Sequence, residues 1–301
     1  MQALICYNPF SGKQTFESKL DYVTKRLKTK YEEVDVFRSI DAKTITTYVE
    51  NFGSNYDLLL VAGGDGSLHE AINGLMRLEK KPVLAYIPMG TVNDVGNMLK
   101  LKKNIKGVMD LVLAGKSVKM DVCKIQDQYF VYAAGVGNFT NVSYDAPSKL
   151  KKHFGRMAYF IEAARELRID DTITLETDDG RGPKKDKYYV ILALNSRRIA
   201  GFRLYRSLPP KLNDGIIDIS FITKAKFRLS IFYLAFFFLL GDRMPGGVKT
   251  LRTNKITLKS DKPLSYNVDG EFAFKENKVT IEVVKEAIDI IVSDKARKRY
   301  F

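Results

Sequence analysis

Strand-like and helix-like segments alternate through the first third of this chain, and no other feature limits its fold so strongly. Four short apolar runs predict strands at 3–8, 34–39, 57–62 and 83–88, and amphipathic segments predict helices at 15–30, 41–52 and 67–78. Strands that alternate with helices form a parallel sheet that helices cover on both faces. We therefore expect a doubly wound α/β domain, whose ligands bind at the carboxyl ends of the strands.

Beyond residue 121 the pattern changes to strand-like segments separated by turn residues, which predicts an antiparallel β-sandwich. The expected strands are 187–195, 216–223, 255–260, 264–268 and 278–284, and two helix-like segments lie near 155–168 and 227–240. A chain of 301 residues exceeds the size of a single core. We expect an α/β domain of residues 1–122 with a return of 287–301, and a β-rich domain of residues 123–286.

The segment Gly63-Gly64-Asp65-Gly66-Ser67 separates a predicted strand from a predicted helix. Glycines let the backbone approach a phosphate closely, and free N–H groups at a helix start attract an anion. Ser67 could cap that helix. A carboxylate at Asp65 would repel a bare phosphate, so it indicates a bound Mg²⁺ or a role in accepting a nucleophile's proton. A tight turn with an N-cap is the alternative.

Two more polar loops follow predicted strands of the same sheet, so all three loops are expected at one edge. Pro-Met-Gly-Thr-Val-Asn-Asp at 88–94 offers Thr91 and Asn93 to a ligand, although helix capping alone also explains Asn93. Asn-Pro-Phe-Ser-Gly-Lys at 8–13 follows the first strand and could contact phosphates, but it lacks the spacing of a Walker A loop.

These three motifs, with Asp214-Gly215 and Asp269-Gly270-Glu271 downstream, resemble the diacylglycerol kinase catalytic family, which includes bacterial lipid kinases and sphingosine kinase relatives. They occur in the family's order and span nearly the whole chain. Gly-Gly-Asp-Gly also occurs in NAD kinases, but the 88–94 motif favours the lipid kinases. The resemblance implies an NAD kinase/phosphofructokinase-like N-terminal domain. It also implies transfer of the γ-phosphate of ATP, with Mg²⁺, to a primary lipid hydroxyl, such as that of diacylglycerol to give phosphatidic acid.

The resemblance also implies roles for individual residues. Asp65 and Asp121 would organise the Mg²⁺, and Glu271 would be the general base, with Asp65 as its rival. A structural metal would bind the side chain of Asp214 and the carbonyls of Lys211 and Ile216, although simple turns also explain 213–215 and 269–270. The implied nucleotide-binding residues are Asn8, Pro9, Ser11, Gly12, Lys13, Gly63, Gly64, Gly66, Ser67, Glu70, Thr91 and Asn93.

Some positions depart from the family pattern. Ser67 replaces the usual threonine but keeps the hydroxyl, while 37–39 lacks a threonine often found after the second strand. Asn138-Phe139 stands where an aromatic–aspartate pair is common, so we assign it no role. The two histidines, His69 and His153, are too few for a metal site, and we expect both on helix surfaces.

The charge balance favours a polyanionic partner, because 49 Lys and Arg against 35 Asp and Glu give a net charge of +14. Between residues 224 and 260 eight side chains are basic and only Asp242 is acidic. The apolar run 227–240 inside that segment is too short to span a bilayer. It either packs in the core or dips into the membrane interface beside the basic side chains.

We therefore expect a cytoplasmic protein that binds peripherally to the anionic inner face of the membrane and finds its lipid there. Only two cysteines occur and the N-terminal residues do not read as a signal peptide, which agrees with the cytoplasm. Without a zinc-finger spacing, an RNP motif or a basic zipper, nucleic acid is not an expected partner. A homodimer stays open.

Other functions remain open on the sequence. A kinase of a soluble acceptor such as NAD would keep the glycine-rich loop, and a sphingoid base or phosphatidylglycerol could replace diacylglycerol as the lipid. A membrane- or nucleic-acid-binding module without catalysis would explain the charge alone.

Overall fold

The computed structural model describes residues 1–12, 14–41, 43–102, 104–137, 172–196, 198–199, 202–203, 211–223 and 248–301. The helix-like segments predicted at 155–168 and 227–240 lie outside the described residues, as do Lys13, His153 and the pair 138–139. None of the described helices combines the length and the apolar character that crossing a membrane requires.

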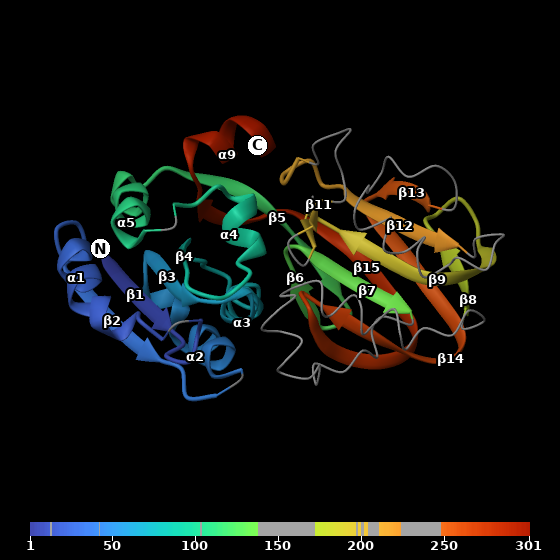
Figure 1. The fold of residues 1–301 in the computed structure, drawn as a ribbon, viewed down its shortest axis with the longest axis horizontal. Helices are drawn as coiled ribbons and strands as arrows, with labels where there is room; N and C mark the ends of the chain where they lie inside the picture. The colour runs from blue at the N-terminus through green and yellow to red at the C-terminus, as the bar shows by residue number, and fades with distance from the viewer. Residues whose placement is uncertain are drawn as a thin grey trace, which may run out of the picture.

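A parallel sheet with helices on both faces forms the N-terminal part (Figure 1). Its strands run in the order β4-β3-β1-β2, and every neighbouring pair is parallel. The elements are β1 (Gln2–Tyr7), α1 (Glu17–Leu27), β2 (Glu33–Arg38), α2 (Thr44–Phe52), η1 (Gly53–Asn55), β3 (Leu58–Gly63), α3 (Asp65–Leu75), β4 (Val83–Pro88), α4 (Asp94–Met98) and α5 (Ile105–Ala114).

Alternation of side chains along the strands explains the two helical layers. Ile5 and Leu60 belong to the apolar cluster that also contains residues of α1 and α5, whereas Leu4 and Leu59 belong to the cluster with residues of α2 and α3. Successive side chains of a strand point to opposite faces, so a central parallel strand must be apolar on both. The mixed α/β arrangement predicted from the alternating pattern is therefore present.

The rest of the chain is rich in strands that are mainly antiparallel. They are β5 (Ser117–Ile125), β6 (Gln128–Phe130), β7 (Ala133–Gly137), β8 (Ile173–Asp178), β9 (Lys184–Leu194), β10 (Arg198–Ile199), β11 (Phe202–Arg203), β12 (Ile217–Thr223), β13 (Val248–Thr253), β14 (Lys255–Val268) and β15 (Glu271–Ile291), followed by α9 (Asp294–Tyr300). A second apolar core, which includes Phe130, Ile191, Ile219, Tyr266 and Val279, lies between these strands.

The long strand β15 joins the two parts of the molecule. It pairs antiparallel with β14 and β5, and near its end Ile290 pairs in parallel with Leu84 of β4. Hydrogen-bonded neighbours therefore run without a break from β13 to β2. The division into residues 1–122 with 287–301 and residues 123–286 stays a proposal, and so does the β-sandwich.

Four of the predicted elements differ from the observed ones in extent. The predicted strands 255–260 and 264–268 are one strand, because the irregularity between Lys259 and Leu264 bends β14 without ending it. The predicted strand 278–284 is only the middle of β15. The helix predicted at 67–78 begins earlier, at Asp65, which changes the environment of that carboxylate.

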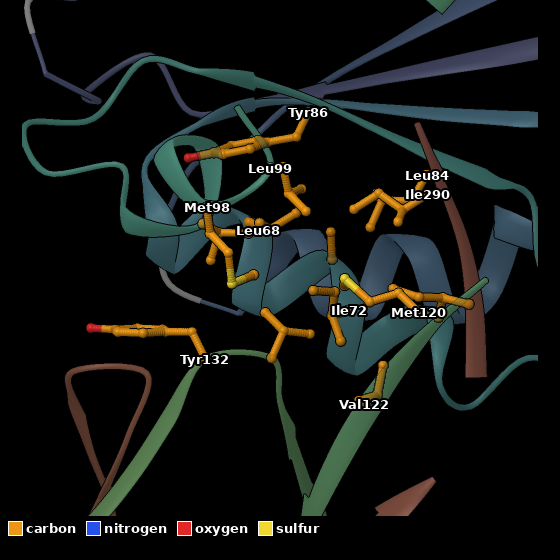
Figure 2. Packing of buried hydrophobic residues seen from close by; sticks show 14 of the residues in the cluster. Leu68, Ile72, Leu84, Tyr86, Met98, Leu99, Met120, Val122, Tyr132 and Ile290 are labelled. Carbon is orange, nitrogen blue, oxygen red and sulfur yellow. The ribbon is translucent and has the colours of Figure 1, made fainter. Parts of the chain in front are cut away.

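Apolar packing fixes α3 against the β-rich part (Figure 2). Leu68 and Ile72 of α3 belong to the same buried cluster as Met120 and Val122 of β5 and Tyr132. All five are at most 7% exposed. The helix that follows the glycine-rich loop is therefore held by both parts of the molecule, which sets where the downstream strands can place their side chains.

Candidate active site

Three loops at the carboxyl ends of β1, β3 and β4 contact one another, as the sequence predicts. The Ser11 hydroxyl accepts a hydrogen bond from the Gly64 N–H over 3.1 Å. A β-carbon on Gly90 would lie 2.7 Å from the Gly64 Cα, and one on Gly12 would overlap the carbonyl oxygen of Met89. Side chains at Gly12 and Gly90 would clash with the neighbouring backbone, so glycine lets the three loops meet backbone to backbone in a narrow edge.

The loop after β4 is held by its own side chains. The Asn93 Oδ1 accepts a hydrogen bond from the Gly90 N–H over 2.8 Å, and its Nδ2 donates to the Gly90 carbonyl over 2.6 Å. Below it, the buried Tyr86 hydroxyl donates to the Gly63 carbonyl over 3.1 Å. Asn93 therefore shapes the loop, while Thr91 is exposed and open to a ligand.

Other residues of these loops that are predicted to bind the nucleotide contact their own chain neighbours. The Asn8 Oδ1 accepts a hydrogen bond from the Phe10 N–H over 2.9 Å, and Pro9 is buried. Ser67 is 5% exposed and packs against Gly63. The prediction that Ser67 caps α3 is wrong, because the residue before the helix is Gly64 and Ser67 lies inside the first turn.

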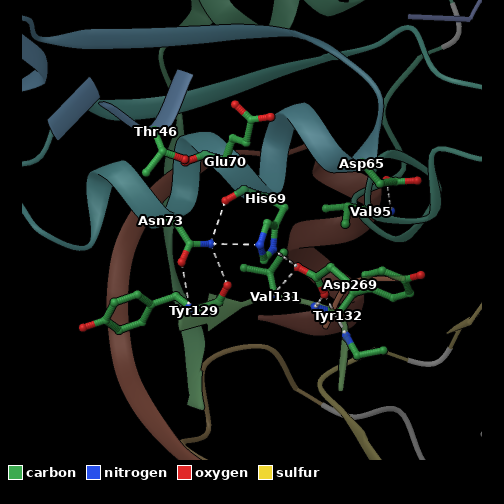
Figure 3. Close-up of polar contacts among 11 residues, drawn as sticks. Thr46, Asp65, His69, Glu70, Asn73, Val95, Tyr129, Val131, Tyr132 and Asp269 are labelled. Carbon is green, nitrogen blue, oxygen red and sulfur yellow. Dashed lines mark hydrogen bonds and ion pairs between the residues drawn. The ribbon is translucent and has the colours of Figure 1, made fainter. Parts of the chain in front are cut away.

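Asp65 is the first residue of α3, and its carboxylate faces the start of α4. The backbone N–H of Asp94 donates to one of its oxygens over 3.0 Å. The N–H of Val95 donates to the other over 3.2 Å (Figure 3). Burial raises the pKa of Asp65 to about 6 although these two hydrogen bonds lower it, and the nearby carboxylates of Asp94 and Asp269 raise it further. No described Lys or Arg forms an ion pair with Asp65. Within the described part of the chain its anionic form therefore has no cationic partner, which suits a ligand of a metal ion.

The turn between β14 and β15 brings a second carboxylate to the same edge. Asp269 and Gly270 both have positive φ, +48° and +96°, as a tight hairpin turn requires. The next residue, Glu271, is exposed, and its Oε1 lies 3.0 Å from the position of a β-carbon on Gly66. Glu271 therefore reaches the first turn of α3 from the opposite part of the molecule.

Asp269, on that turn, is the centre of a buried hydrogen-bond network (Figure 3). Its side chain is 3% exposed and accepts hydrogen bonds from the backbone N–H groups of Val131, Tyr132 and Ala133, over 3.0 to 3.3 Å. The His69 Nδ1 lies 3.1 Å from its Oδ2.

The prediction that His69 lies on a helix surface is wrong, because its side chain is only 18% exposed and contacts Asp269. Nothing in the local pattern of α3 signals this contact, since the two residues are 200 positions apart.

Glu70 holds α2 in the structure. Its Oε2 accepts a hydrogen bond from the Ile45 N–H over 3.2 Å, and its carbonyl accepts one from the Thr46 hydroxyl over 3.0 Å. Burial raises the pKa of Glu70, against the hydrogen bonds from the start of α2. The sequence alone does not indicate two further hydroxyl groups beside the start of α2. They belong to Ser39 and Thr44 and lie 2.9 Å apart.

Asp121 contacts a different loop from the one that holds Asp65. Its two oxygens accept hydrogen bonds from Gly215 N–H and Glu286 N–H, both over 2.7 Å, and its own N–H donates to the Leu212 carbonyl. Burial raises its pKa despite these hydrogen bonds. Asp121 therefore joins the loop 211–216 to an irregular point of β15, and no contact between described residues links it to Asp65.

The predicted structural-metal loop pairs with a cation from another element, Arg252 of β13. The Asp214 Oδ1 accepts a hydrogen bond from the Ile216 N–H over 3.1 Å, and its Oδ2 lies 3.0 Å from the Arg252 guanidinium. Arg252 also pairs with Asp218 over 3.3 Å, and Lys211 is exposed. Within the described ranges no three His, Cys, Asp or Glu side chains are grouped so that they could hold a metal ion.

Acidic partners on other strands neutralise much of the described part of the basic segment 224–260. Arg252 pairs with Asp214 and Asp218, Lys255 lies 3.3 Å from Glu282, and Lys259 lies 4.0 Å from Glu176. In the described part of this segment, the excess of positive charge at the surface is therefore smaller than the count along the sequence suggests. The apolar run within the segment lies outside the described residues.

Comparisons with known proteins place this geometry in a family. Residues 2–125 match the model of the diacylglycerol kinase catalytic domain. A protein named diacylglycerol kinase from Staphylococcus aureus strain JH9 is 33% identical over 284 residues, which cover 91% of this chain and 87% of the relative; the one from strain Newman matches equally.

The fold is also that of solved structures. A crystal structure of a diacylglycerol kinase from Bacillus anthracis strain Sterne superposes with a TM-score of 0.79 at 23% identity, over 98% of both chains. Another structure from that organism superposes with a TM-score of 0.83 at 22% identity, also over 98% of both chains. At these identities the likeness concerns the fold alone.

Proposed function

Because this chain belongs to the diacylglycerol kinase family and is a lipid kinase, we propose that it transfers the γ-phosphate of ATP to the primary hydroxyl of diacylglycerol, giving phosphatidic acid. The observation that carries this proposal is the position of Glu271 against Gly66, where a carboxylate from the β-rich part meets the glycine-rich loop.

The triphosphate binds across the three loops that end β1, β3 and β4. Gly12, Gly64 and Gly90 let the three loops meet backbone to backbone, and the first turn of α3, which no side chain caps, directs its N–H groups to the same edge. Ser11 already contacts Gly64 and so orients the first loop towards the second. Thr91 is the exposed hydroxyl at this edge, which suits a contact with the nucleotide.

The residues of this edge fit a magnesium ion, and Asp65 would hold it. An Asp carboxylate is a preferred oxygen ligand of Mg²⁺, and this one carries a raised pKa and no ion pair with a described cation. The bound metal supplies charge neutralisation for the phosphates. In the absence of a contact with Asp65, Asp121 acts instead by holding the loop 211–216 and β15 in place.

Glu271 accepts the proton of the attacking hydroxyl. Phosphoryl transfer depends mostly on positioning and charge neutralisation, with a carboxylate that takes the nucleophile's proton. Glu271 is exposed, so an acceptor can reach it, and it lies beside Gly66, so the acceptor is then next to the phosphate loops. Asp65 suits this task less, because its carboxylate is directed to the backbone at the start of α4, whereas Glu271 is exposed.

The same proposal includes the division of the chain into two domains and the place where the protein works. Residues 1–122 with 287–301 form an NAD kinase-like nucleotide domain, and residues 123–286 form a sandwich that presents the lipid. The protein works at the anionic face of the membrane, where its substrate is. Among the described cations of the basic segment, Arg252, Lys255 and Lys259 have acidic partners, which leaves Lys249 available for that surface.

The proposal is tested by following label from γ-labelled ATP into a panel of acceptors in mixed micelles, with Mg²⁺ and with EDTA. We expect label in diacylglycerol, none with EDTA, and little in a sphingoid base, phosphatidylglycerol or NAD. Transfer mainly to another acceptor would replace the substrate assignment, and no transfer to any of them would overturn the proposal.

A further inference from the structure

We propose that His69 is a positioning residue for the transfer reaction, because it connects α3, the helix after the glycine-rich loop, to the turn that carries Glu271. Its Nδ1 lies 3.1 Å from the Asp269 carboxylate, and Asp269 is two residues before Glu271 (Figure 3). The reaction and the role of Glu271 belong to the proposed function, on which this inference rests. The contacts on both sides of the ring are properties of the structure itself.

On one side of the ring, Asn73 is fixed by the backbone. The Asn73 Oδ1 accepts a hydrogen bond from the Tyr129 N–H over 2.9 Å, and its Nδ2 donates to the carbonyls of Tyr129 and His69, each over 2.9 Å. All three bonds require the amide in one orientation, with the NH₂ group towards the ring. The Asn73 Nδ2 then lies 3.3 Å from the His69 Nε2.

This orientation decides which ring nitrogen of the neutral imidazole carries hydrogen. Both hydrogens of this NH₂ group go to carbonyls and an amide nitrogen does not accept, so a hydrogen on Nε2 would find no acceptor at this contact. The carboxylate facing Nδ1 favours a donor there. The neutral ring of His69 therefore carries its hydrogen on Nδ1 and donates it to Asp269.

On the other side, Asp269 transmits the position of the ring to the turn. Three backbone N–H groups from the segment 131–133 and the His69 ring donate to one carboxylate, and the Asp269 N–H donates to the Ala133 carbonyl over 2.7 Å. His69 is the only side chain among these donors, and it comes from α3. Gly66, beside which Glu271 lies, is one turn earlier on that helix.

The charges around the ring keep this link in place when His69 is protonated. Burial alone lowers the pKa of His69, but the hydrogen bond to Asp269, with the carboxylates of Asp269, Glu271 and Glu70 nearby, raises it more. An imidazolium donates from Nδ1 as the neutral ring does. The contact with Asp269 therefore persists in both states.

Two substitutions at His69 test the hydrogen-bond donor of the side chain separately from its size. His69→Asn places an amide nitrogen close to where Nδ1 lies, so it can still donate to Asp269. His69→Leu fills similar space without a donor. Val112→Ala, fully buried on α5 in a cluster that contains no residue of α3, is the control for a loss of stability that does not touch the network.

The first experiment measures kcat and the KM for ATP of the full chain and the three variants with diacylglycerol in mixed micelles. We expect His69→Leu to lower kcat by about 10²-fold, the cost of misplacing a reacting group by about 1 Å, with the KM for ATP unchanged. His69→Asn should recover most of that loss, and Val112→Ala should keep the wild-type kcat. If His69→Asn is as slow as His69→Leu, or if His69→Leu keeps the wild-type kcat, the inference is overturned.

A second measurement requires no activity. The chain has two histidines, so ¹⁵N-histidine labelling gives two imidazole spin systems, and His69→Asn identifies the one from His69. At alkaline pH we expect the hydrogen of the neutral ring on Nδ1, whereas exposed histidines favour Nε2. The Nε2–H form would overturn the inference even if the lipid kinase assignment holds. The Nδ1–H form without any phosphoryl transfer would count against the proposed function alone.

Discussion

Glu271 lies against Gly66, so the turn between β14 and β15 meets the first turn of α3, the helix that follows the glycine-rich loop. Neither part of the molecule forms this edge alone. The buried cluster that joins Leu68 and Ile72 to Met120 and Val122 holds the two parts together beneath it. The proposed role of Glu271 depends on that arrangement.

Gly66→Ala should lower activity without lowering stability. The new β-carbon would lie 3.0 Å from the Glu271 Oε1, at the end of a flexible side chain, so Glu271 moves and the fold does not. Alanine inside a helix is favoured over glycine by about 1 kcal/mol. We expect a reduced kcat with a melting temperature equal to or above that of the wild type. A variant that melts well below the wild type would show that the substitution disturbs packing instead.

Gly12→Ala should abolish binding of the magnesium–nucleotide complex. Gly12 has a φ of +56°, and its β-carbon would overlap the Met89 carbonyl. Gly180→Ala is the control, because Gly180 also has positive φ but nothing lies within 4 Å of its β-carbon position. Both substitutions place an alanine at positive φ, which costs about 1–2 kcal/mol in each variant. Calorimetric titration should show binding only to Gly180→Ala, and equal affinities would contradict the assigned loop.

Asp269→Ala should be among the most destabilising single substitutions in the chain. It leaves the N–H groups of Val131, Tyr132 and Ala133 without their acceptor in a buried site. Removal of one partner from a buried charged network costs about 3–5 kcal/mol. Urea unfolding at neutral pH measures this directly, and a loss below about 1 kcal/mol would mean that water replaces the carboxylate easily.

The metal-free protein should lose stability, relative to Asp65→Asn, as pH rises from about 4 through about 6. Burial raises the pKa of Asp65 to about 6 in the fold, whereas an unfolded aspartate titrates near about 3.9. The folded state therefore holds the proton more tightly, and ionisation costs at most about 3 kcal/mol. Unfolding free energies of both proteins in EDTA across this range check the prediction. A difference that does not change with pH would show that Asp65 ionises freely.

Arg252→Ala should cost more stability than Lys255→Ala. Arg252 pairs with Asp214 and with Asp218, whose side chain is 11% exposed, whereas Lys255 and Glu282 are 60% and 39% exposed. Exposed ion pairs contribute about 0–1 kcal/mol, while a buried carboxylate without its cation is far more costly. Thermal unfolding of the two variants gives the comparison. Equal losses would mean that Arg252 does not stabilise the loop 211–216.

The sequence predicts the edge of the sheet well, because the carboxyl ends of parallel strands must meet. The segments after β1, β3 and β4 therefore converge wherever the helices pack. Local signals also place turns at 213–215 and 269–270, which the positive φ of Gly215, Asp269 and Gly270 agrees with.

Contacts between distant elements could not be predicted in the same way. His69 has no periodic signal that relates it to Asp269, and Asp121 reads as part of an ordinary strand although it binds the loop 211–216 and β15. The charge of the basic segment was counted along the chain, whereas Glu176 and Glu282, which neutralise part of it, come from other strands. Such pairings depend on the register between strands, which a single sequence specifies only weakly.

The most direct test of this account is a single-turnover measurement with Glu271→Gln, in which the protein is saturated with labelled ATP and Mg²⁺ and then mixed with diacylglycerol micelles. The substitution keeps size and removes the acceptor for the hydroxyl proton, so we predict unchanged nucleotide affinity and a transfer rate lower by about 10²–10⁴-fold. A transfer rate equal to that of the wild type would contradict the role of Glu271 and, with it, the reading of the whole edge.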